Sequence, residues 1–107
     1  MNINDLGKES FERAKRKGFY DTVPTIPERL CLIHSEVSEA LEAFRDDCLT
    51  TLPNENGKPE GLPSELADIV IRVADMAHWL GIDLEQEIRL KSDFNESRPV
   101  KHGRVNL

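Results

Sequence analysis

Two long segments of the chain carry apolar residues at steps of three and four, which is the spacing of one face of an α-helix. In the first segment these residues are Leu30, Ile33, Val37, Ala40, Leu41 and Phe44. In the second they are Leu66, Ile69, Val70, Val73, Ala77 and Leu80. No stretch of alternating residues is typical of a strand, so the pattern predicts an all-α fold.

Capping residues and helix breakers divide the chain into four expected helices. Asn2, the capping-box sequence 25–28 and Asp83 are typical helix starts, and Pro99 ends the last helix. The turn-rich segment 48–62 is the one long loop. The expected helices cover about residues 3–17, 26–47, 63–81 and 84–97. The 107 residues therefore predict a single domain, 1–107, arranged as a four-helix bundle.

Charge and composition exclude several classes of protein. With 20 acidic and 14 basic residues the net charge is −6, whereas nucleic-acid binding needs a basic surface. The sequence contains no run of eighteen apolar residues, so no membrane span is predicted, and residues 1–10 lack the apolar region of a signal peptide. Cys31 and Cys48 lack metal-ligand spacing and are expected to be free thiols. We therefore expect a cytoplasmic protein with neither nucleic acid nor membrane as a partner.

The chemistry-bearing side chains that remain are carboxylates. The sequence has no glycine-rich phosphate loop and no recognisable nucleophile motif, and its three histidines are too scattered for a zinc site. Glu36 and Glu39 lie three residues apart on the second helix, as Glu65 and Asp68 do on the third. Residues at this spacing face the same way, and carboxylate oxygens are the ligands that Mg²⁺ and Mn²⁺ prefer. Each pair also fits a solvated helix face.

The third helix adds a charge argument. Most of its circumference is apolar, which indicates a largely buried helix. Its one polar ridge carries Glu65, Asp68, Arg72, Asp75 and Trp79. Buried carboxylates must be paired or bound to a metal. A ladder in which Arg72 pairs with the acids on either side of it is the structural alternative, but one arginine leaves a deficit of positive charge that a divalent cation would fill.

In order and spacing these motifs resemble the MazG-like nucleotide pyrophosphohydrolases of the all-α NTP pyrophosphatase superfamily. That family carries ExxE on one helix and ExxD on the next. Here the matching stretches are residues 32–42, LIHSEVSEALE, and residues 65–71, ELADIVI. A Lys-xxx-Asn-xx-Arg pattern follows near the end. The resemblance covers about residues 15–104, although Ser35 stands where many members carry a further acid.

The resemblance implies a fold, a reaction and a cofactor. Members are all-α and hydrolyse nucleoside triphosphates to the monophosphate and pyrophosphate with Mg²⁺, for which Mn²⁺ can substitute. Glu36, Glu39, Glu65 and Asp68 are then the expected catalytic residues and metal ligands, and Asp75 is a candidate further ligand. Phosphate transfer of this kind depends on charge neutralisation and positioning, which suits a cluster of carboxylates holding metal. Removal of unwanted deoxynucleotides is the implied role.

Residues outside the carboxylate motifs are expected to bind the substrate. Lys91, Asn95 and Arg98 project from one side of the fourth helix and match the family pattern, so we expect them to meet the triphosphate. Three basic residues of the tail, Lys101, His102 and Arg104, are expected to close over it. Tyr20 and Trp79 are candidates for stacking on the base. The alternative for the fourth helix is a solvated end whose cations complement the helix dipole.

The apolar circumference of the third helix predicts a homo-oligomer, either a dimer or a tetramer. Its second apolar side, Ala67, Ile71 and Ala74, is expected to pack against another subunit. The family resemblance implies the same assembly, with sites at helix interfaces.

Two other functions compete with the hydrolase. A di-iron carboxylate bundle needs two ExxH motifs, and residues 75–78 approximate one. A non-catalytic helical interaction module would keep the fold without the activity, and its melting temperature would be indifferent to Mg²⁺ and Mn²⁺. One geometric question also stays open, because Glu36 and Glu39 lie further from the loop than Glu65 does. Either the loop folds back along the bundle, or the second helix ends early.

Overall fold

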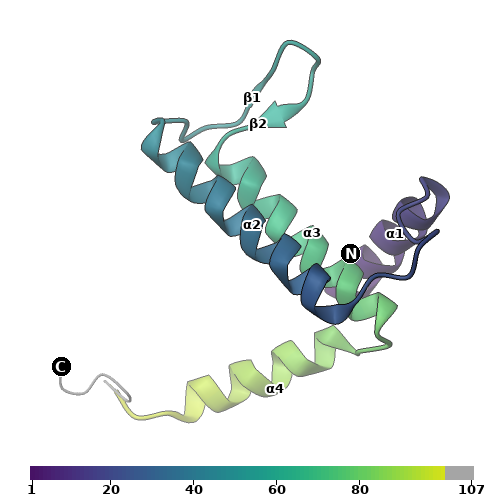
Figure 1. Ribbon diagram of the computed structural model, residues 1–107. Helices are drawn as coiled ribbons and strands as arrows, with labels where there is room; N and C mark the ends of the chain where they lie inside the picture. Colours follow the sequence, from purple (N-terminus) through teal and green to yellow (C-terminus); the bar gives the residue numbers. More distant parts are fainter. Residues whose placement is uncertain (101–107) are drawn as a thin grey trace.

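The computed structural model describes residues 1–100 and confirms the all-α class (Figure 1). Its four helices are α1 (Ile3–Arg16), α2 (Ile26–Arg45), α3 (Leu62–Trp79) and α4 (Leu84–Ser97). Two short strands, β1 (Leu52–Pro53) and β2 (Pro59–Glu60), lie between α2 and α3. No helix among the described residues is long and apolar enough to cross a membrane.

The expected helix starts are confirmed by side-chain caps. The Asn2 carboxamide accepts from the Asp5 N–H at 2.9 Å. Thr25 forms a complete capping box, in which the Glu28 N–H donates to Thr25 Oγ1 and the Glu28 carboxylate accepts from the Thr25 N–H. Each cap satisfies N–H groups that have no partner within the helix itself, so the first turns of α1 and α2 are fixed locally.

The expectation that the chain contains no strand is wrong for the segment between α2 and α3. Leu52 pairs with Glu60 and Pro53 with Pro59 in an antiparallel hairpin. Asn54 holds its turn, because the Asn54 carboxamide oxygen accepts from two backbone N–H groups within the hairpin. A ladder of two residues on each strand is too short to show the alternation from which strands are predicted.

The hairpin also answers how α2 and α3 are joined. The Leu62 N–H donates to the Cys48 carbonyl at 2.8 Å, which closes the loop at its base. The hairpin therefore projects beyond the helix ends instead of folding back along them (Figure 1). Gly61 caps α3 at φ +121°, where a Cβ would meet the Thr50 carbonyl oxygen. Helix α2 does not end early, since it continues to Arg45.

Helix α1 packs across α3 at a close approach. Gly7 is buried, and a Cβ at this position would lie 2.5 Å from the Ala74 carbonyl oxygen. Ala74 itself is 1% exposed. Any larger residue at position 7 would push the two helices apart. The expectation that Ala74 faces another subunit is therefore wrong, because α1 of the same chain covers it.

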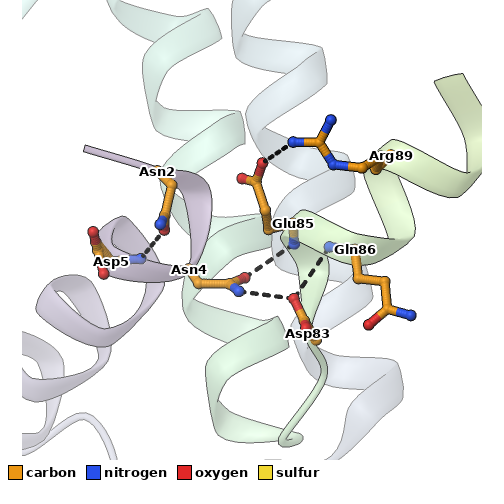
Figure 2. A network of polar contacts seen from close by, with 7 residues as sticks. All are labelled: Asn2, Asn4, Asp5, Asp83, Glu85, Gln86 and Arg89. Carbon is orange, nitrogen blue, oxygen red and sulfur yellow. Dashed lines mark hydrogen bonds and ion pairs between the residues drawn. The ribbon is translucent and has the colours of Figure 1, made fainter.

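Helix α4 projects away from α1, α2 and α3 (Figure 1). Its contact with them is at its first turn, where Asn4 of α1 meets the cap of α4 (Figure 2). Asn4 Nδ2 donates to Asp83 Oδ1 at 2.8 Å, and Asn4 Oδ1 accepts from the Glu85 N–H at 3.0 Å. No residue of α4 is buried. Over residues 1–100 of one chain, the four helices therefore do not form the expected closed bundle.

Apolar side chains of α2 and α3 form an exposed surface, which we call the apolar face. Its members are Leu30, Val37, Leu41 and Phe44 of α2, and Leu66 and Val70 of α3, each 46–60% exposed. At 100° per residue around the helix axis, the members on α2 lie about 140–180° from Glu39, and those on α3 lie about 160° from Asp68. Glu39 and Asp68 thus point nearly opposite to the apolar side chains of their own helices, whereas Glu36 and Glu65 lie only about 80–140° from them.

The core of the described chain is small. Its buried hydrophobic residues are Ala40, Ala74 and Ala77, and no large side chain among residues 1–100 is fully buried. The stripes that sequence periodicity assigned to a core therefore lie largely on the surface. Large exposed apolar patches on soluble proteins commonly mark interaction surfaces.

Candidate metal centre

Carboxylates from two helices converge beside one cavity. Glu36 of α2 with Glu65 and Asp68 of α3 can each offer an oxygen so that all three oxygens lie within 4.8 Å of one another. Glu39 lies outside this trio but lines the same cavity. Glu36 is nine residues from the end of α2 and Asp68 six from the start of α3, an axial offset of only about 4.5 Å. The antiparallel pairing of the helices therefore brings the two motifs together.

The cavity has a volume of about 580 Å³ and lies between α1, α2 and α3. Five carboxylates line it, from Glu36, Glu39, Glu65, Asp68 and Asp75. Five cationic side chains also line it, from Arg13, Lys17, Arg29, Lys58 and Arg72. The cavity is therefore highly charged, and much of the positive charge comes from segments that carry none of the carboxylate motifs.

Arg72 pairs with the other helix. Its Nε donates to Glu36 Oε1 at 2.8 Å, and the Glu36 side chain is 10% exposed. The alternative ladder with Asp68 and Asp75 is absent from the described part of the chain. Within residues 1–100, no ion pair neutralises Glu65 or Asp68. Glu65 and Asp68 therefore lack a close ion-pair partner among the described residues, although the cavity as a whole is lined by as many cations as carboxylates.

Negative charges crowd around the Glu65 carboxyl group. Burial raises the pKa of its carboxyl group, and the charges of Glu39, Asp68 and Glu36 raise it further, while Lys58 lowers it. A carboxyl group in such surroundings holds its proton more tightly than a free one does. A divalent cation at this position would reverse the effect by favouring the ionised form.

Asp75 is held by an aromatic cluster next to the trio. Tyr20 Oη donates to Asp75 Oδ1 at 3.0 Å, and Asp75 is 9% exposed. The Tyr20 ring centroid lies 4.7 Å from that of Phe11 and 6.2 Å from that of Trp79, and the Arg29 guanidinium stacks on the Tyr20 ring at 4.5 Å. Burial, followed by the hydrogen bond to Asp75, raises the Tyr20 pKa to about 12.

Tyr20→Phe tests this cluster. We expect it to lower the free energy of unfolding by about 1–3 kcal/mol at pH 7, because the buried Asp75 carboxylate loses its donor while the ring packing is kept. Urea denaturation measures the loss. In the folded wild type the phenol pKa lies above its unfolded value, so this stabilisation is lost as the pH rises from about 10 through about 12. The difference in free energy of unfolding between the wild type and the variant should therefore narrow over that range. Equal free energies of unfolding at pH 7 would contradict a stabilising hydrogen bond from Tyr20 to Asp75.

The expected substrate residues are placed less centrally. Lys91, Asn95 and Arg98 are exposed on or at the end of α4, and none of them lines the carboxylate cavity. Arg98 contacts Asn95 at 3.4 Å and lies 5.5 Å from the Phe94 ring. Tyr20 and Trp79 also do not line the cavity. The tail residues expected to close over the triphosphate lie outside the described residues.

Sequence reasoning missed the cationic wall of the cavity. Ser10, Arg13, Ala14 and Lys17 line it from α1 at spacings of three and four, which the sequence displays but which dipole complementarity also explained. Arg29 lies seven residues before Glu36 and therefore on the same face of α2. Lys58 reaches the cavity from the hairpin, and no periodicity could indicate that.

Comparison with known proteins adds no relative. No family model, no curated protein and no solved structure matches the chain. The donor set itself is the remaining guide to chemistry. A cluster of carboxylate oxygens without histidine or cysteine suits the hard cations Mg²⁺, Mn²⁺ and Ca²⁺, and not zinc or soft metals.

Proposed function

We propose that the protein is a Mg²⁺-dependent nucleoside triphosphate pyrophosphohydrolase, which converts a nucleoside or deoxynucleoside triphosphate and water into the monophosphate and pyrophosphate. One observation carries the proposal: Glu36, Glu65 and Asp68 converge to within 4.8 Å from two helices. Glu65 and Asp68 have no ion pair within residues 1–100. The order of the motifs, which resembles that of the MazG-like enzymes, supports the same reaction.

Different residues of the chain would have different roles in this reaction. Glu36, Glu39, Glu65 and Asp68 would hold the cation, which supplies charge neutralisation at the phosphates and a lowered pKa for water. Arg72 positions Glu36 through their 2.8 Å contact, leaving the second Glu36 oxygen free for a ligand. Water cleaves the anhydride bond between the α- and β-phosphates, and pyrophosphate leaves. Removal of unwanted deoxynucleotides from the pool is the role we propose for this activity in the cytoplasm.

A second copy of the chain completes the assembly in this proposal. The apolar face and the unpacked α4 are the two features of a single chain that need a partner. A dimer or tetramer that buries the apolar face would close a helical bundle between chains. It would also allow Lys91, Asn95 and Arg98 of a projecting α4 to reach the cavity of a neighbouring subunit.

A product screen tests the proposed function. Common and damaged nucleoside and deoxynucleoside triphosphates are incubated with the protein and Mg²⁺, and the products are identified by phosphorus NMR. We expect monophosphate and pyrophosphate in equal amounts from at least one substrate, with chelator abolishing the reaction. Release of orthophosphate and a diphosphate would contradict the proposed bond cleavage, and no turnover with any substrate would favour the interaction module.

Arg98→Ala tests the place of α4 in the site. We expect it to weaken the binding of a non-hydrolysable triphosphate by about tenfold or more, since a guanidinium meets two phosphate oxygens at once. Arg98→Lys should restore the affinity only in part. Calorimetric titration with Mn²⁺ on the same variants should show unchanged metal binding. Unchanged triphosphate affinity would return α4 to the solvated-helix alternative.

A further inference from the structure

The α1 side of the cavity contains a buried polar group without a partner. Ser10 is 5% exposed and lines the cavity, and its Oγ has no hydrogen-bond partner among the described residues. Arg29 Nε, on the same cavity, is likewise buried without an acceptor. Buried polar groups are normally satisfied, so two unsatisfied donors on residues that line one cavity indicate an acceptor that residues 1–100 do not supply.

Two of the cations that line the cavity, Lys17 and Lys58, have no ion pair within residues 1–100. Arg29 is stacked on the Tyr20 ring, which leaves the edge of its guanidinium unpaired. Arg13 also lines the cavity but is already paired with Glu9 at 2.8 Å. The local charge on this side therefore favours an anion.

The geometry of α2 places this side next to the carboxylates. Arg29 precedes Glu36 by two helical turns, so the two side chains leave the same face of α2 about 10.5 Å apart along the axis. A ligand with a cation at one end and an anionic group at the other would span the cavity between them. A metal-bound phosphate chain has this form.

We propose that Ser10, Lys17 and Arg29 form an anion subsite that receives a terminal phosphate of the substrate, opposite the carboxylate trio. The inference rests on the proposed function in taking the anion to be a phosphate. It assigns a binding role to the basic residues at the end of α1. Complementarity to the helix dipole, the other explanation of these residues, gives them no such role. Lys15 lies in the same basic run but does not line the cavity, so it provides a matched control.

Calorimetric titration of the full chain with inorganic pyrophosphate in saturating Mg²⁺ tests the subsite. Lys17→Gln and Ser10→Ala should each weaken binding by about tenfold, as expected for the loss of a hydrogen bond to a charged group, whereas Lys15→Gln should change it by less than about twofold. Without ligand, Ser10→Ala should melt at or above the wild-type temperature, because it removes an unsatisfied hydroxyl. A purely structural role for Ser10 would lower that temperature.

Two results would overturn the inference. One is the absence of pyrophosphate binding by the wild type, and the other is equal affinity in Lys17→Gln and Lys15→Gln together with normal affinity in Ser10→Ala. Turnover in the product screen separates this failure from failure of the proposed function. If the protein hydrolyses a triphosphate but the Ser10 and Lys17 variants bind pyrophosphate normally, the anion subsite alone is refuted. If these variants lose pyrophosphate binding but the wild type hydrolyses nothing, the proposed reaction is refuted and the anion site stands.

Discussion

We expect pyrophosphate release to fall by at least about 100-fold when a carboxylate of the motif pairs is replaced by its amide, because loss of a proposed metal ligand should cost more than the 10–100-fold typical of an outer-shell partner. The four variants are Glu36→Gln, Glu39→Gln, Glu65→Gln and Asp68→Asn. Steady-state kinetics in saturating Mg²⁺ measures the effect. Glu42→Gln is the matched control, since Glu42 lies on the same helix and contacts Arg45 on the exposed surface.

The same variants should keep the fold. Glu36→Gln retains an amide oxygen that can accept from Arg72 Nε, so the contact between α2 and α3 survives without its charge. Glu65→Gln should raise the melting temperature of the metal-free protein at neutral pH. The raised Glu65 pKa means that the folded chain loses stability as the pH rises through that pKa, and glutamine has no such proton to lose. A variant that lost its helical circular dichroism together with activity would show a structural role for that residue.

Charge introduced on the apolar face should dissociate the assembly. Leu41→Glu removes a large side chain that is worth about 1.5–3 kcal/mol when buried, and a two-fold interface counts it twice. The dissociation constant should therefore rise by about 100-fold or more. Sedimentation equilibrium measures it. Unfolding should become less cooperative as well, because the core of one chain contains three alanines and no large buried side chain among the described residues.

A control separates this effect from exposure in general. Val23 is 77% exposed, lies before α2 and is not part of the apolar face, so Val23→Glu should leave the oligomer intact. A wild-type protein that sediments as a folded monomer of 12.2 kDa at micromolar concentration would contradict the proposed assembly. Val70→Glu, on α3, should behave as Leu41→Glu does if both helices contribute to one interface.

Local signals were enough to predict the helices. Caps at Asn2, Thr25 and Asp83 depend on residues within three positions of each other, so their contacts are encoded in short stretches of sequence. The carboxylate pairs were predictable for the same reason. That α2 and α3 bring Glu36 within reach of Asp68 was implied only by the family resemblance, since the geometry depends on how the loop between Cys48 and Leu62 closes.

Tertiary packing decided what the sequence left open or placed wrongly. Helical periodicity shows that Leu41 and Val70 share a face with other apolar residues, but it is the same for a buried core and for an interface. Ala74 was assigned to an interface because its side of α3 is apolar, yet the small size of Gly7 lets α1 cover it. Pairing of Arg72 along its own helix was the structural alternative to a metal site, whereas its contact with a residue 36 positions away has no signal in the sequence.

Calorimetric titration with Mn²⁺ tests most directly whether the carboxylate trio is a metal centre, since the proposed reaction depends on it. The wild type is expected to bind Mn²⁺ and to melt at a higher temperature in its presence. Glu65→Gln should lose this binding, and Glu42→Gln should keep it. Equal binding by all three proteins, or a wild-type melting temperature indifferent to Mn²⁺ and Mg²⁺, would contradict the metal centre.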